Sequence, residues 1–65
     1  MTTANHSAAR AALQIIANIE LRLAMLKQQI DPAAGVVNNV PTVCGLAIGI
    51  DDELVALRDN LVRFL

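Results

Sequence analysis

The sequence predicts an all-α protein, a two-helix hairpin with an apolar irregular linker, whose core is completed by oligomerisation. Two segments, at about residues 7–30 and 51–65, carry apolar residues at alternating spacings of three and four, which is typical of amphipathic helices. The chain has only 65 residues, yet 55% of them are hydrophobic and the mean hydropathy is +0.52. We expect one small helical domain over residues 1–65, with more apolar surface than it can bury alone.

The segment 7–30 carries the strongest pattern in the chain. Polar residues share a second strip of the predicted helix, and Glu20 and Lys27 separate the main apolar stripe from a weaker apolar ridge of Leu13, Ala17 and Ala24. A helix that is apolar on more than one side is expected to contact more than one neighbour. The main apolar stripe consists of Ala9, Ala12, Ile16, Ile19, Leu23, Leu26 and Ile30, and the polar strip of Gln14, Asn18, Arg22 and Gln29.

The ends of this first helix carry local signals. Asn5 or Ser7 is expected to cap its start, because their side chains can accept a hydrogen bond from a free backbone N–H. We expect the helix to end near Ile30, because Asp31 precedes Pro32 and the residue before a proline is pushed out of the helical region. Asp31 is then expected to cap a single turn.

The linker at about residues 31–50 is expected to be irregular. Within it, residues 35–43 combine β-branched residues with an Asn-Asn pair, which favours a loop or a short hairpin-like turn. A longer second helix starting after Pro41 with Thr42 as its cap would continue the same apolar spacing. We favour the later start because Gly45 and Gly49 would each cost about 1 kcal/mol inside a helix.

The second helix is predicted over about residues 51–65. Three acids, Asp51, Asp52 and Glu53, suit the positive end of a helix dipole, and Ile50 could pack onto Val55. Leu54, Leu57, Leu61 and Phe64 then follow at spacings of three and four.

Association is the expected source of extra stability. A domain of this size gains little more from its core than it loses in conformational entropy. One cysteine excludes an intrachain disulfide, and one histidine with one cysteine cannot complete a tetrahedral metal site. We therefore predict a homo-oligomer, a dimer or larger. Its interface is predicted to contain Ile16, Ile19, Leu23, Leu26, Leu54, Leu57 and Leu61.

Candidate chemistry is sparse, so we predict no catalytic residue, no metal and no cofactor. Cys44 has no neighbouring histidine in the sequence and no CxxC pattern, which favours a buried small hydrophobe. His6 is expected to be structurally neutral in a polar segment. The run from Asp51 to Glu53 lacks the spacing of a calcium loop. The chain is therefore not expected to be an enzyme.

Charge and hydropathy argue against nucleic-acid and membrane binding. Five basic residues are spread against six acids, for a net charge of -1, so no basic patch emerges to neutralise a phosphate backbone. The longest uncharged stretch, residues 32–50, contains two prolines, glycines and asparagines, which are costly in hydrocarbon. The amino terminus does not resemble a secretory signal, so a cytoplasmic location is expected.

Two functions follow as hypotheses. The first is a non-catalytic helical oligomerisation or protein-interaction module, because the chain has more aliphatic surface than one hairpin can bury. The second is a small-ligand-binding or sequestering accessory protein, with a pocket at a subunit interface lined by the linker and by basic residues. The residues proposed for that pocket are Asn38, Asn39, Arg58 and Arg63.

Overall fold

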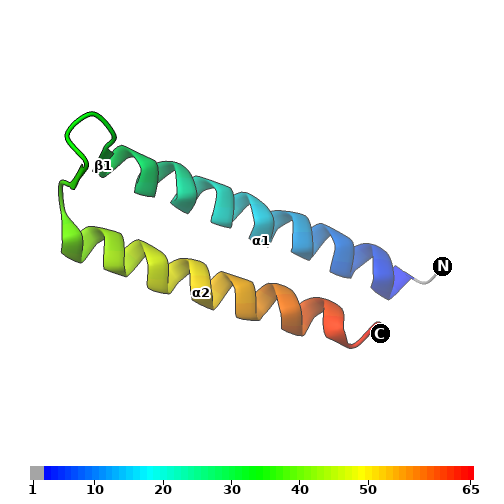
Figure 1. The fold of residues 1–65 in the computed structure, drawn as a ribbon. Helices are drawn as coiled ribbons and strands as arrows, with labels where there is room; N and C mark the ends of the chain where they lie inside the picture. Colours follow the sequence, from blue (N-terminus) through cyan, green and yellow to red (C-terminus); the bar gives the residue numbers. More distant parts are fainter. Residues whose placement is uncertain (1–2) are drawn as a thin grey trace.

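In the computed structural model, which describes residues 3–65 and side chains from His6 onward, the chain forms an antiparallel hairpin of two long helices (Figure 1). These are α1 (Thr3–Gln28) and α2 (Val40–Val62). The molecule is a rod of 51 × 15 × 15 Å with a radius of gyration of 15.3 Å. A compact domain of this length has a radius of gyration of about 11 Å. The predicted two-helix hairpin is confirmed. The molecule is elongated because it consists of a single layer of two helices.

Helix α1 starts earlier and ends slightly earlier than predicted. It begins at Thr3, so Ser7 lies inside the helix instead of capping it, and the side chain of Asn5 lies outside the described residues. The alanine-rich first turns explain this extension, since alanine has the highest helix propensity. At the other end the N–H of Gln29 donates to the carbonyl of Leu26 at 3.0 Å, which closes the last turn before Pro32.

A small β-ribbon forms the connection between the helices. Strand β1 (Ile30–Asp31) pairs with β2 (Val36–Val37), with Ile30 opposite Val37. The carboxylate of Asp31 accepts from the backbone N–H groups of Ala33 and Ala34 at 3.0 and 3.2 Å, the turn-capping role predicted for it. Gly35 completes the turn at a φ of +69°, a conformation that favours glycine.

Helix α2 begins at Val40, so the favoured start at Asp51 and the long linker over 31–50 are wrong. Asn39 has extended backbone angles, and its side-chain oxygen accepts from the N–H of Thr42 at 3.1 Å. This N-cap and the proline in the first turn together define the start. The acids from Asp51 to Glu53 consequently lie in the middle of α2, away from its positive end, and Ile50 is not an N-terminal staple.

The helices meet along a seam with a regular spacing of three and four. Among the described side chains only Ala8 and Ala12 are buried, at 1% and 7% exposure, and the other seam residues are half-buried. Small side chains at this end let the helices approach closely. The hairpin seam consists of Ala8, Ala12, Ile15, Ile19, Arg22, Leu26 and Gln29 from the first half of the chain, and Val43, Leu46, Ile50, Glu53, Leu57 and Asn60 from α2.

The predicted polar strip is therefore only partly a solvent-facing surface. Gln14 is exposed and donates to Asn18 at 3.2 Å. Arg22 and Gln29, in contrast, lie in the hairpin seam, and Asn18 is half-buried beside it. Arg22 enters the seam because Glu53 on α2 supplies the opposite charge, with 3.1 Å between Nη1 and Oε1.

Candidate interaction surface

One side of the hairpin carries a continuous row of exposed aliphatic side chains on each helix. Their exposed fractions run from 39% for Ile16 to 58% for Val40 among the large residues. The total exposed area of the chain is 4861 Å², whereas a compact monomer of 6.9 kDa exposes roughly 4,000 Å². We call this side the apolar face; it consists of Ala9, Ile16, Leu23 and Ile30 from the first half of the chain, and Val40, Ala47, Leu54 and Leu61 from α2.

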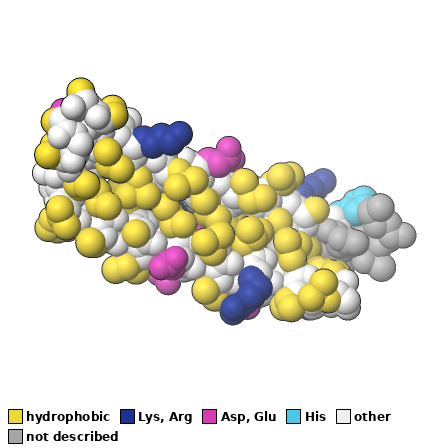
Figure 2. Space-filling view, in the orientation of Figure 1, with side chains coloured by type: hydrophobic (Ala, Val, Ile, Leu, Met, Phe, Trp, Pro, Cys, Tyr) yellow, Lys and Arg dark blue, Asp and Glu magenta, His cyan; other side chains and the backbone are white. Residues whose placement is uncertain are grey.

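Helix geometry places both rows on the same side. Within each helix the members recur every seven residues, which is close to two turns, so they line up along the axis. Every helical member of the apolar face except Val40 directly follows a seam residue, as Leu23 follows Arg22 and Leu54 follows Glu53. In an antiparallel pair that shared offset turns both rows toward the same side. Figure 2 shows the result, a yellow band that runs over both helices along the length of the rod.

Charged residues border the apolar face without interrupting it. Glu20, Lys27, Asp51 and Arg58 each lie four residues, about one helical turn, after a member of the face. Blue and magenta side chains lie along both edges of the band in Figure 2. The border therefore carries two acids and two bases, with no net charge.

The opposite side of the hairpin has a different character. A shallow groove of about 390 Å³ lies there, and polar side chains contribute to its lining. Arg22 crosses this side next to Gly49, where an added Cβ would lie 2.7 Å from its Nε. Gly49 thus leaves the space through which Arg22 reaches Glu53. The groove residues are Asn18, Leu21, Arg22, Met25, Leu46 and Glu53.

The structure divides the predicted interface residues into two groups. Ile19, Leu26 and Leu57 are half-buried in the hairpin seam. Four others lie on the apolar face and are exposed: Ile16 (39%), Leu23 (45%), Leu54 (47%) and Leu61 (42%). Sequence reasoning missed Val40 and Ala47 as members of this face, because both fell inside the predicted linker. Their seven-residue spacing from Leu54 and Leu61 is the signal that could have identified them.

The predicted ligand residues lie at opposite ends of the rod. Asn39 caps α2, and Asn38 donates its backbone N–H to the carbonyl of Gln29 at 2.7 Å, both at the connection. Arg58 lies one turn from the far end of α2 and pairs with Asp59 at 3.2 Å, both exposed.

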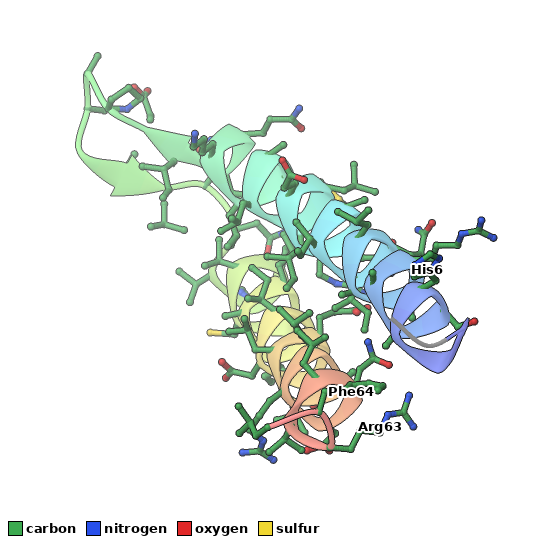
Figure 3. All side chains as sticks on the ribbon, turned by 90° about the vertical axis from the view of Figure 1, so that its right-hand side faces the viewer. His6, Arg63 and Phe64 are labelled. Atoms are coloured by element: carbon green, nitrogen blue, oxygen red, sulfur yellow. The ribbon has the colours of Figure 1, made fainter. Side chains whose placement is uncertain are left out.

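Arg63 lies at the terminal end of the rod, where Figure 3 also places Phe64 and His6. It donates to Asn60 at 3.3 Å, and its guanidinium carbon lies 5.3 Å from the centroid of the Phe64 ring. One copy of the chain therefore does not bring the two predicted asparagines and the two predicted arginines together.

Cys44 is exposed in the hairpin, which contradicts its predicted role as a buried small hydrophobe. It directly follows the seam residue Val43, and one residue turns a helical side chain by about 100°. Within residues 3–65 no three histidine, cysteine or carboxylate side chains cluster in a way that could hold a metal ion. The acids at 51 and 52 are exposed, whereas Glu53 serves the ion pair with Arg22.

Comparisons with known protein families, with curated proteins and with solved structures find no match for this chain. Neither helix in the described part of the chain combines the length and the apolar character needed to cross a membrane.

Proposed function

We propose that this chain is a non-catalytic helical assembly module, which completes its fold by packing its apolar face against another protein. The apolar face carries the proposal. Six large aliphatic side chains, each 39–58% exposed, form two parallel rows on it. They expose on the order of 500 Å² of contiguous apolar surface, and soluble monomers rarely expose larger patches.

The interior of the hairpin supports the same proposal. Two buried alanines are the whole of its fully buried apolar core among the described side chains. Alanine loses little water-exposed area on burial, so this core contributes little hydrophobic stabilisation. A two-helix unit with such a core needs further apolar burial to be stable.

The alternative, a small-ligand site built from Asn38, Asn39, Arg58 and Arg63, has weaker support. Within one hairpin, Asn39 and Arg63 lie at opposite ends of α2, a helix of 23 residues that is about 35 Å long. Such a site would require the connection of one copy to lie beside the terminal end of another.

Thermal unfolding and binding of an apolar-surface dye test the proposal, measured on dilute protein and on dilute Leu23→Glu. At dilutions at which no other protein covers the apolar face, the wild type is expected to unfold with weak cooperativity and to bind the dye. Dye binding should be lower in Leu23→Glu, because the carboxylate disrupts the apolar patch. A fully helical monomer that unfolds cooperatively at every concentration and binds no dye would contradict it.

A further inference from the structure

We infer that the partner of the apolar face is a second copy of this chain, and that two hairpins pack face to face as a four-helix bundle. This inference rests on the proposed function and names its partner. The apolar face and the adjacent seam residues together form one stripe with spacings of three and four on each helix. In a face-to-face pair this stripe points toward the centre of the bundle.

Every position of that central stripe is apolar from Ala9 to Ile30 and from Val40 to Phe64. In the first half of the chain it consists of Ala9, Ala12, Ile16, Ile19, Leu23, Leu26 and Ile30, and in the second half of Val40, Val43, Ala47, Ile50, Leu54, Leu57, Leu61 and Phe64. The polar seam residues Arg22, Gln29, Glu53 and Asn60 lie on the other flank of the hairpin contact, away from this centre.

The size of the face matches a second hairpin. A rod of 51 × 15 Å has a footprint of about 750 Å², close to the roughly 800 Å² that each partner buries in a standard stable interface. A two-fold pair presents the same face twice, so the two partners agree in length and in width.

The border charges also permit self-pairing. Glu20 and Asp51 are balanced by Lys27 and Arg58, so two copies meet without an excess of like charge at the rim. The opposite side of the hairpin, in contrast, contains the Arg22–Glu53 ion pair and Asn18, which would have to lose water on packing. The apolar face is therefore the side on which a copy packs.

Sedimentation equilibrium of the full chain tests the inference with a matched pair of variants. Leu23 lies on the apolar face at 45% exposure, and Leu21 lies on the groove side at 63%. The wild type is expected to have the mass of two copies at micromolar concentration. Leu23→Glu should weaken dimerisation at least about a hundredfold, because both copies lose a buried leucine and desolvate a carboxylate. Leu21→Glu should leave the mass unchanged.

A second pair covers the case in which Leu23→Glu fails to fold. Leu54→Ala removes a side chain from the apolar face without adding charge, and Ile48→Ala does the same to a side chain on α2 that is 62% exposed and not part of the face. We expect Leu54→Ala to weaken dimerisation about tenfold or more, and Ile48→Ala to leave it nearly unchanged.

Three results would overturn the inference: a monomeric wild type, an assembly of more than two copies, or an equal loss of dimer affinity by both variants of either pair. A monomeric wild type that still binds the apolar-surface dye overturns the second copy as partner and leaves the assembly function standing. A cooperative monomer that binds no dye overturns both.

Discussion

Replacing the two glycines of α2 by alanine is expected to have two different effects. Gly45→Ala should stabilise the protein by about 1 kcal/mol, because alanine loses less backbone entropy in a helix and a Cβ at this position meets nothing within 4 Å. Gly49→Ala gains the same helix propensity, but its methyl group would lie 2.7 Å from Nε and 3.3 Å from Cδ of Arg22. Arg22 must then move and give up its 3.1 Å contact with Glu53.

The cost of that movement sets the expected difference between the two variants. The side chains of Arg22 and Glu53 are 35% and 20% exposed, so solvent screens their attraction and its loss costs about 0.5–1 kcal/mol. The net effect of Gly49→Ala should accordingly be close to zero. In an Arg22→Ala background the obstruction is absent, and Gly49→Ala should recover the full gain of about 1 kcal/mol.

Urea unfolding followed by circular dichroism, at one fixed protein concentration, measures the stability of the four variants. These are Gly45→Ala, Gly49→Ala, Arg22→Ala and the double variant of Arg22→Ala with Gly49→Ala. Equal gains for both glycine variants in the wild-type background would show that Arg22 does not cross at Gly49. A destabilising Gly45→Ala would show that this part of α2 is covered in solution. The first result would refute the packing described for the groove side, and the second would refute the open space described at Gly45.

Four further substitutions test the connection and the exposed thiol by urea unfolding. Asn39→Ala should lower the free energy of unfolding by about 1 kcal/mol, because the α2 cap is lost. Asn38→Ala should change it by no more than about 0.5 kcal/mol, because Asn38 bonds to Gln29 through its backbone. Equal losses of stability in the two variants would argue against the assigned cap. Gly35→Ala should lower the free energy of unfolding by about 1 kcal/mol, because φ is +69° at this position, even though a Cβ there would meet no neighbouring atom. An unchanged stability would mean that the turn does not have this backbone conformation in solution. Cys44→Ser should change stability by less than about 0.5 kcal/mol, and the wild-type thiol should react with a thiol reagent as an exposed cysteine does; a protected thiol would show that this edge is covered.

The hairpin could be predicted from the sequence because apolar periodicity persists over both helices. The start of α2 could not, because two local signals compete. The acids from Asp51 to Glu53 resemble a helix start, and Gly45 and Gly49 argue against a helix before them. The cap at Asn39 decides the outcome, and Gly49 is tolerated because of a contact with Arg22, which lies 27 residues earlier in the chain. Such a contact has no signature in a local window.

The candidate surface could be predicted in part, for a related reason. Periodicity identified the most apolar stripe of α1, including Ile16 and Leu23, but it does not say which neighbour that stripe faces. In the hairpin, α1 turns a more polar stripe toward α2, because Arg22 finds Glu53 there and Ala8 permits close approach. The most apolar stripe is thereby left half outside the hairpin, and this rotation exposes the apolar face.

Solvent accessibility of individual leucine methyl groups tests the central claim, that the apolar face is covered in solution, most directly. Methyl signals of the 65-residue chain would be recorded with and without a soluble paramagnetic agent, which broadens the signals of exposed groups. Leu23 and Leu54, half-exposed in the single hairpin, should be protected, while Leu21, at 63% exposure on the groove side, should be strongly broadened. Broadening of Leu23 and Leu54 as strong as that of Leu21 would contradict the account.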